Sequence, residues 1–232
     1  MMKVGVFTDP HYSSREFTCG NRYNSRSLEK IRQAYAFFEK EACDLVICLG
    51  DLSDTDDSHE KELENLREAA TVIRSSRLRT VCVMGNHDAF AFTQEEFYTV
   101  LDGCRPEPVA VDGKTILFAD ACYFRSGARY MPGDTDWTDT FCPHTEELKA
   151  QLAAAQGEVC LCLHQNADPD IRSDHRLYNA DAIHEMLRCS GKVKAVWQGH
   201  YHPGGQSEHD GIRYRTFPAM CENEDAVFVE EF

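Results

Sequence analysis

The chain has 232 residues, with 24 Lys and Arg against 39 Asp and Glu, which gives a net charge of −15 at pH 7. Such a negative surface repels the backbone of nucleic acids and anionic lipids, so neither long nucleic acid nor a membrane is expected as a partner. A small phosphorylated substrate stays compatible with this charge, because a bound cation can reverse the potential inside one cleft. The length suits one substantial domain, and we expect residues 1–232 to form it.

The N-terminal stretch and the cysteines bear on the compartment. Residues 1–10, MMKVGVFTDP, lack the basic and long apolar segments of a secretory signal, and no apolar run approaches the roughly 18 residues of a membrane helix. There are 11 cysteines, several of them inside apolar runs, and they form no C-x-x-C framework. We therefore expect free thiols in a reducing compartment, the cytoplasm.

Apolar runs and helical patterns alternate in the first half of the chain. Strands are expected at 4–7, 44–49 and 80–84, with helices at 27–41 and 60–75 between them. Thr93 is expected to cap a further short helix that carries Glu95 and Glu96 in its first turn. The order β-α-β-α-β is typical of an α/β fold.

The second half has longer connections. Strands are expected at 114–119, 158–163 and 193–197, a helix at 145–155, and another that Asn179 caps and that ends near 191. A hairpin at 206–217 and a strand at 226–230 complete the chain. The irregular stretch 120–143 has the length of a functional lid. Its residues Tyr123, Arg125, Arg129, Tyr130 and Trp137 could hold a base and a phosphate, or could simply pin the loop to the domain.

Polar side chains follow five of the expected strands. In chain order these are Asp9 and His11, then Asp51, then Asn86, His87 and Asp88, then His164, and finally His200 and His202. The carboxyl ends of strands form the ligand-binding edge of α/β sheets, so the five segments can converge. In an extended chain residues two apart point to the same side, which suits Asp9 with His11 and His200 with His202.

Seven of these side chains form a coherent set of oxygen and nitrogen donors. They are Asp9, His11, Asp51, Asn86, His164, His200 and His202. The set suits Mn, Fe, Zn or Co, and it is too large for one catalytic ion, whereas two ions about 3.5 to 4 Å apart with a shared carboxylate would use it fully. The remaining histidines, His59, His144, His175, His184 and His209, are interpreted as ordinary surface residues.

The ordered motifs Asp9-x-His11, Gly50-Asp51, Gly85-Asn86-His87-Asp88, His164 and Gly199-His200-x-His202 carry a resemblance to the calcineurin-like metallophosphoesterases. The resemblance spans residues 9 to 202. It implies an α/β fold, a four-layer α-β-β-α sandwich of two mixed sheets, with two divalent or mixed-valence transition-metal ions at the sheet edges.

The resemblance also implies a role for each site residue. One ion would be held by Asp9, His11, Asp51 and His202, and the other by Asn86, His164, His200 and the same Asp51. His87 would contact the phosphate and protonate the leaving alkoxide. Asp54 is the candidate to orient His87, and Asp88 remains an alternative for that task.

The implied activity is hydrolysis of a phosphate ester by attack of a metal-bridging hydroxide, because two cations neutralise the phosphate oxygens and lower the pKa of a bound water. A looser similarity to manganese-dependent ADP-ribose and CDP-alcohol diphosphatases rests on Arg22-Tyr23, the helix around Leu28 and residues 136–139. It favours a phosphodiester or diphosphate bond in a small substrate, of which a nucleotide is one candidate.

Residues 50–54, Gly-Asp-Leu-Ser-Asp, lack the Arg that protein phosphatases place after the equivalent Asp, which argues against a phosphoprotein substrate. A phosphomonoesterase of broad specificity and a non-catalytic scaffold of the same fold remain alternatives. The sequence leaves the substrate-binding residues and the oligomeric state open.

Overall fold

The computed structural model describes residues 1–134, 141–172 and 174–232. The elements in chain order are β1 (Lys3–Phe7), a 3-10 turn η1 (Asn24–Arg26), α1 (Ser27–Lys40), β2 (Leu45–Cys48), α2 (His59–Ser75), β3 (Arg79–Cys82), α3 (Asn86–Ala91), α4 (Gln94–Val100), β4 (Val109–Val111), β5 (Lys114–Ala119), α5 (Thr145–Ala154), β6 (Val159–Leu163), α6 (Ala180–Ser190), β7 (Val193–Gln198), β8 (Gly205–His209), β9 (Ile212–Thr216) and β10 (Phe228–Glu231).

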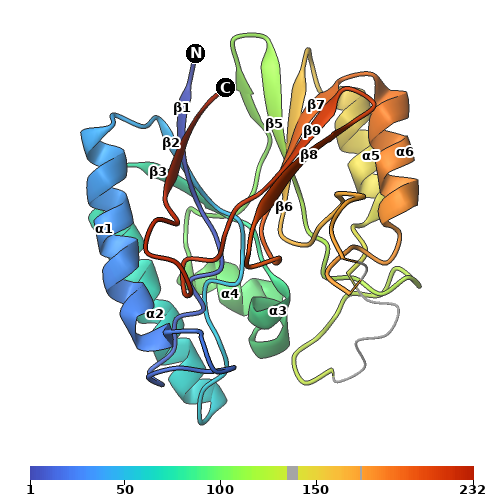
Figure 1. The fold of residues 1–232 in the computed structure, drawn as a ribbon. Helices are drawn as coiled ribbons and strands as arrows, with labels where there is room; N and C mark the ends of the chain where they lie inside the picture. Colours follow the sequence, from blue (N-terminus) through green and yellow to red (C-terminus); the bar gives the residue numbers. More distant parts are fainter. Residues whose placement is uncertain (135–140, 173) are drawn as a thin grey trace.

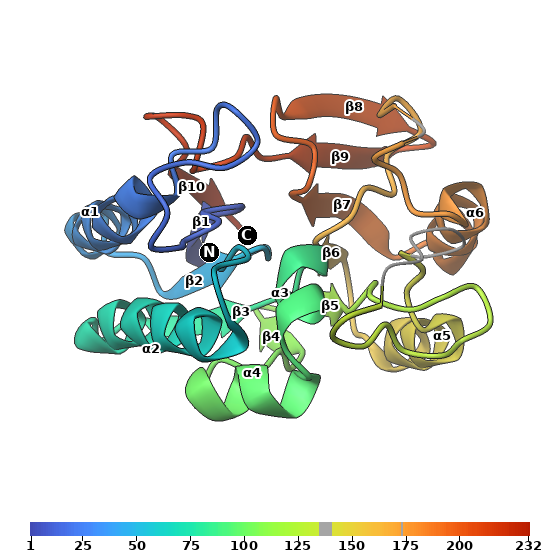
Figure 2. The ribbon, with the colours of Figure 1, turned by 90° about the horizontal axis from the view of Figure 1, so that it is seen from below.

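Two mixed sheets lie face to face. The first has the strand order β10-β1-β2-β3, with β10 antiparallel to β1 and the other neighbours parallel. The second has the order β4-β5-β6-β7-β9-β8, parallel at its centre and antiparallel at both edges. Helices α1 and α2 cover the outer face of the first sheet, and α5 and α6 that of the second (Figures 1 and 2). The expected four-layer α-β-β-α architecture is confirmed.

Successive side chains of a strand point to opposite faces of its sheet, so a strand that is buried on both faces contributes to two apolar clusters, one between the sheets and one beneath the helices. Leu45 and Ile47 of β2 belong to the apolar cluster between the sheets, which also contains Trp197 of the second sheet. Val46 and Cys48 point the other way, into the cluster beneath α1 and α2. Because both faces of β2 are buried, the strand reads as a continuous apolar run rather than as an alternating one.

The expected elements are present with small shifts at their ends, and two details differ. Thr93 caps α4 as predicted and accepts a hydrogen bond from the Glu96 amide. Asn179 occupies the N-cap position of α6 as predicted. Its side chain makes no capping hydrogen bond, however, so the prediction that it caps the helix is wrong. Helix α3 and strand β4 were not expected, since six and three residues are too few for a clear periodicity.

All the parallel strands of both sheets run in one direction, so their carboxyl ends lie on the same side of the molecule, near α3 (Figure 1). The candidate site is built there. Among the helices within the described residues, none is long and apolar enough to cross a membrane.

Candidate metal centre

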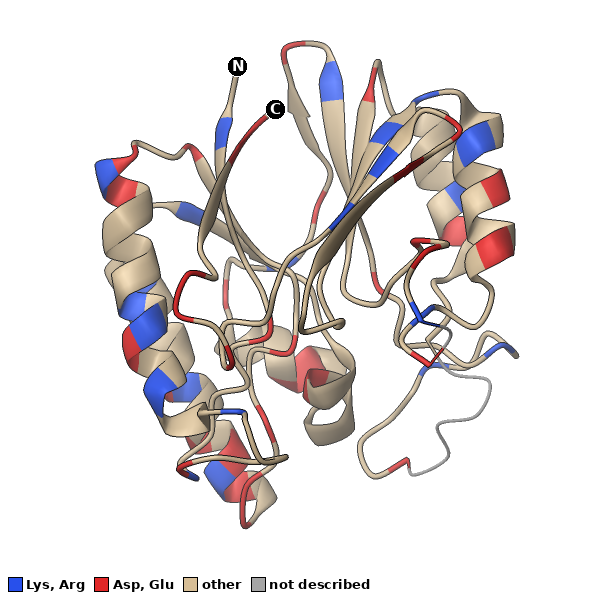
Figure 3. Cartoon of the chain, viewed as in Figure 1, with Lys and Arg blue, Asp and Glu red and all other residues tan. Residues whose placement is uncertain are grey.

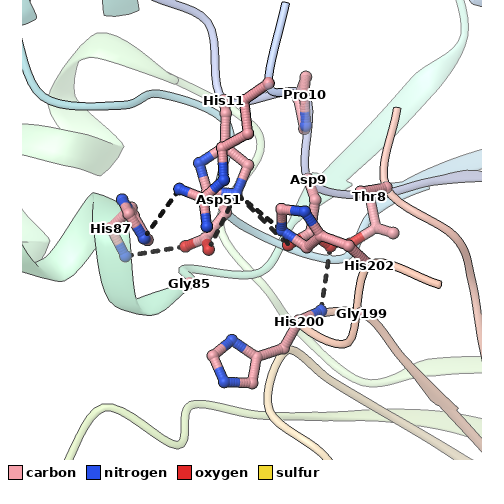
Figure 4. Close-up of polar contacts among 12 residues, drawn as sticks. Thr8, Asp9, Pro10, His11, Asp51, Gly85, His87, Gly199, His200 and His202 are labelled. Carbon is pink, nitrogen blue, oxygen red and sulfur yellow. Dashed lines mark hydrogen bonds and ion pairs between the residues drawn. The ribbon is translucent and has the colours of Figure 1, made fainter. Parts of the chain in front are cut away.

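The loops that follow β1, β2, β3 and β7 meet at one place (Figure 4), and the loop after β6 joins them there. Backbone hydrogen bonds join them directly. The amide of Asp9 donates to the Gly50 carbonyl at 3.0 Å, that of His11 to the Asp51 carbonyl at 2.9 Å, and that of Gly199 to the His164 carbonyl at 3.0 Å. The seven expected ligand side chains are thereby brought into one region.

A first cluster forms around Asp9. The Nε2 atom of His11 lies 3.6 Å from Oδ1 of Asp9 and 3.5 Å from Oδ2 of Asp51. The Nε2 atom of His202 lies 3.4 Å from the same Asp9 oxygen and 3.3 Å from Nε2 of His11. These donor atoms face a common point, as ligands of one ion would.

A second cluster shares Asp51 with the first. The Nε2 atom of His164 lies 3.1 Å from Oδ2 of Asp51 and 3.2 Å from Oδ1 of Asn86. His200 completes the group, and one donor atom each from Asp51, His164 and His200 lies within 4.8 Å of the others. The shared carboxylate is the one that the motif pattern assigns to a bridging position.

Four of these residues have a left-handed backbone. The φ angles are +51° at Asp9, +47° at His11, +50° at Asp51 and +65° at His200. The expectation that Asp9 and His11 converge because the chain is extended is therefore wrong, and His200 and His202 lie in different clusters. Non-glycine residues at positive φ are uncommon and strained, and such strain concentrates at functional sites.

The donor set fits cations. Oδ1 of Asp9 is buried and has no hydrogen-bond partner among the described residues. Burial acts to lower the pKa of His11, but the facing carboxylates of Asp54 and Asp9 outweigh it and raise that pKa to about 10. The charges of Asp51 and Asp9 likewise overcome burial at His164 and raise its pKa to about 9. The raised pKa values show that the carboxylates create a negative potential at these buried imidazoles. The same negative potential favours the binding of a dication.

His87 lies beside the clusters and outside both. Its Nδ1 atom is 3.0 Å from Oδ1 of Asp54, and its ring meets that of His11 edge-on with the centroids 4.6 Å apart. Burial acts to raise the pKa of Asp54, but the imidazoles of His11 and His87 outweigh it and hold that pKa far below its usual value. An ionised Asp54 therefore faces the Nδ1 atom of His87, which leaves Nε2 directed elsewhere.

Asp88, the alternative partner of His87, has a different set of contacts. Its carboxylate accepts hydrogen bonds from the amides of Gly85, Leu52 and Ser53, and from the Ser53 hydroxyl. It thus ties the first turn of α3 to the loop after β2. Burial and the charge of Asp51 raise the pKa of Asp88 to about 6.

A cleft of about 440 Å³ opens over His87, His200 and His202. Arg22 lines it, with its guanidinium 3.5 Å from both Asp54 Oδ2 and Nε2 of His87. His175 lines it too, with its ring centroid 5.6 Å from that of His200. His175 was interpreted as an ordinary surface residue, so that interpretation is wrong in placing it away from the site.

The stretch 120–143 contributes less to the cleft than its composition suggested. Arg129 pairs with Asp120 and lies over the Tyr123 ring, while Arg125 stacks on Tyr178 at 3.8 Å. Tyr130 is buried. These contacts fit the interpretation that the residues pin the loop. Of this stretch, Phe141 is the described residue that lines the cleft. Trp137 and residues 136–139 lie outside the described residues.

Two residues next to the first donor cluster had no signal in the sequence. Glu222 lies against His202, and Cys221 offers a sulfur within 4.8 Å of donor atoms of His11 and His202. Both belong to an irregular segment after the final hairpin. A single Cys-Glu pair in such a segment matches no ligand spacing, so only the folded chain reveals it.

Over residues 2–204 the chain matches the family described as calcineurin-like phosphoesterase, and it belongs to that family. It is therefore a metal-dependent hydrolase of phosphate esters, and its fold is that of the dimetal phosphoesterases. No curated protein matches the sequence.

Solved structures share this fold at low sequence identity. A dimetal phosphatase from Danio rerio has a TM-score of 0.84 and 16% identity, with 98% of this chain and 91% of that chain covered. TT1561 of Thermus thermophilus has a TM-score of 0.60 at 11% identity, covering 95% and 91% of the two chains. The phosphopantetheinyl hydrolase of Mycobacterium tuberculosis has a TM-score of 0.55 at 13% identity, covering 95% and 90%.

Proposed function

We propose that the chain is a dinuclear metal-dependent phosphohydrolase that cleaves a phosphodiester or diphosphate bond in a small, nucleotide-like substrate. The observation that carries the proposal is the pair of donor clusters that share the carboxylate of Asp51. One cluster would hold an ion with Asp9, His11, His202 and Asp51, and the other with Asn86, His164, His200 and Asp51. When bound, two such ions would neutralise phosphate oxygens and activate water at neutral pH.

His87 supplies what the ions do not. Its Nδ1 atom faces the ionised Asp54, which favours hydrogen on Nδ1 and holds the ring so that Nε2 lies 3.5 Å from the guanidinium of Arg22, a cleft residue. A histidine in this position can hold a proton on Nε2 and deliver it to a departing alkoxide. Asp54 would hold the ring in place without contacting the substrate.

The side chains around the cleft contribute little positive charge of their own, so the proposed ions would supply most of the charge that faces a phosphate. Arg22 is the one Lys or Arg among the described residues that line it, and Asp54 already shares its charge. Asp174 and Glu222 add negative charge nearby. A phosphodiester carries one negative charge and therefore needs less positive charge from the protein itself than a phosphomonoester dianion does.

The wider surface supports a small substrate rather than long nucleic acid. The net charge is −15, and Lys and Arg are interspersed with Asp and Glu along α1 and α2 (Figure 3). All 11 cysteines are free thiols, which fits a reducing compartment and supports the proposal that the protein acts in the cytoplasm.

The test is a substrate panel with the purified, manganese-loaded protein. It compares a phosphomonoester, a phosphodiester, ADP-ribose, a CDP-alcohol and a cyclic nucleotide, with metal content measured on the same preparation. We expect about two ions per chain and the highest kcat/KM on a diester or diphosphate. Preference for the monoester would support a broad phosphomonoesterase instead, and inactivity on every substrate despite full metal loading would support a scaffold.

A further inference from the structure

The segment between β9 and β10 lies against the first donor cluster. The amide of Ala219 donates to the His202 carbonyl at 3.0 Å, that of Met220 to the Thr8 carbonyl at 2.9 Å, and that of Cys221 to the Asp9 carbonyl at 3.1 Å. Residues 219–223 are thus joined to the loops after β1 and β7, which provide Asp9, His11 and His202.

The same segment is held from its other side. Nζ of Lys30 in α1 donates to the carbonyls of Met220 and Asn223, both at 3.0 Å, and the Tyr23 amide donates to the Cys221 carbonyl at 3.1 Å. The side-chain amide of Asn223 donates a hydrogen bond to the Ala219 carbonyl at 2.8 Å, which closes the turn. The backbone at Glu222 is therefore fixed relative to the donor cluster.

Glu222 uses this fixed position to contact His202. Its Oε1 atom lies 2.5 Å from Nδ1 of His202, and the two side chains are 20% and 12% exposed. The opposite nitrogen of the ring, Nε2, faces Asp9 and His11. An imidazole that donates from Nδ1 to a carboxylate carries its lone pair on Nε2.

We propose that Glu222 is a positioning residue for a metal ion: it fixes the tautomer and the rotation of His202 so that Nε2 faces the ion of the first cluster. This inference rests on the proposed function, since it takes His202 as a ligand. Glu222 lies outside every motif that defines the family resemblance.

An acceptor also lies near Nδ1 of two other histidines of the site, and at His164 it is within a hydrogen bond. Nδ1 of His164 faces the Leu49 carbonyl at 2.8 Å, and Nδ1 of His11 faces Oδ2 of Asp54 at 3.4 Å. In each case an acceptor faces Nδ1 while Nε2 faces the donor cluster. Glu222 completes this pattern for His202 with a charged acceptor, which also makes the imidazole a stronger donor to a cation.

The test measures metal binding in the absence of substrate. Manganese content per chain and affinity by titration calorimetry are compared for the wild-type protein, Glu222→Ala and Glu222→Gln. Glu224→Ala serves as the matched control, because Glu224 lies in the same segment with 79% of its side chain exposed and faces Lys30 at 3.4 Å. Thermal unfolding in chelator reports on the fold of each variant.

We expect Glu222→Ala to weaken one of two manganese sites about 10- to 100-fold while the other site keeps its affinity. Glu222→Gln should retain more affinity, because the amide oxygen can still accept from Nδ1. The control should match the wild type, and the unfolding temperature in chelator should be the same for all four proteins.

Unchanged manganese affinity in Glu222→Ala would overturn the inference. An equal loss in Glu224→Ala, or a lower unfolding temperature of the chelated Glu222 variants, would overturn it as well, because the segment would then act only on the fold. A wild-type protein that binds no manganese would instead contradict the proposed function. Two tight sites in every variant would contradict only the inference on Glu222, so the two failures can be told apart.

Discussion

Gly85 leaves room for the shared carboxylate, and replacing it with Ala should displace Asp51. Its φ of −93° and ψ of −179° are open to any residue, so the requirement for glycine is steric. A Cβ atom at this position would lie 2.2 Å from Oδ1 of Asp51 and 2.4 Å from its backbone nitrogen. To restore even the shortest tolerated contact of 3.0 Å, Oδ1 must move by 3.0 minus 2.2, or 0.8 Å.

That displacement cannot stay local. Oδ1 of Asp51 accepts the His87 amide at 2.8 Å, and the Asp51 carbonyl accepts the His11 amide at 2.9 Å. Moving Asp51 therefore disturbs both donor clusters together. Overpacking of this kind costs about 1–3 kcal/mol, and a shift of about 1 Å at an active site can cost on the order of 100-fold in rate.

The assay compares Gly85→Ala with Gly205→Ala. Gly205 is a matched control because its added Cβ would meet only Cδ1 of Ile171, at an ordinary 3.8 Å. We expect Gly85→Ala to lose at least one metal ion per chain and to unfold about 2–10 °C lower, while the control keeps both properties. Full metal content and wild-type turnover in Gly85→Ala would refute the steric argument.

Three further results are expected. His87→Ala should keep its metal ions, measured by metal analysis, and lose about 10²- to 10⁴-fold in kcat, measured by steady-state kinetics. Loss of an ion would instead indicate that His87 is a metal ligand. Asp54→Asn should lower kcat about 10- to 100-fold, because the charge that orients His87 is removed, and an unchanged kcat would contradict that role. Because Asp54 also faces Nδ1 of His11, the metal content of this variant is measured on the same preparation. Chelation should lower the unfolding temperature by about 10–20 °C, since two ions, each at 100 times its Kd, stabilise by about 2.7 kcal/mol each. Equal temperatures would show that the fold is insensitive to the ions.

The layers and the convergence of the site were accessible from the sequence for a simple reason. Buried parallel strands such as 44–49 read as apolar runs, and the polar residue after each run marks its carboxyl end. Asp51 and His164 lie 113 positions apart in the chain, yet both follow such runs. In the structure, Oδ2 of Asp51 lies 3.1 Å from Nε2 of His164. Direction and burial of the strands were enough to predict that meeting.

The local geometry was not accessible in the same way. The left-handed backbone at Asp9 and His11 depends on bonds to the loop after β2, and those partners are distant in sequence. The choice between Asp54 and Asp88 as the contact of His87 depends on the turn into α3, which directs the Asp88 carboxylate back to backbone amides. Glu222 reaches His202 only because Lys30 and the amides of its neighbours hold its segment. Tertiary contacts, rather than spacing, decide each case.

The buried charges explain why these features occur together. Asp9, Asp51 and Asp54 are at most 3% exposed, and carboxylates so close in a low-dielectric site repel one another unless cations lie between them. Without ions, protons on His11 and His164 can balance part of this charge, which is what their raised pKa values of about 10 and about 9 express. When ions are bound, the same imidazoles would offer their lone pairs as ligands, and the carboxylates would have cations as partners. The residues with positive φ and the crowded Gly85 at this edge hold the donors close together before any ion binds, which is the local strain expected of a preformed metal centre.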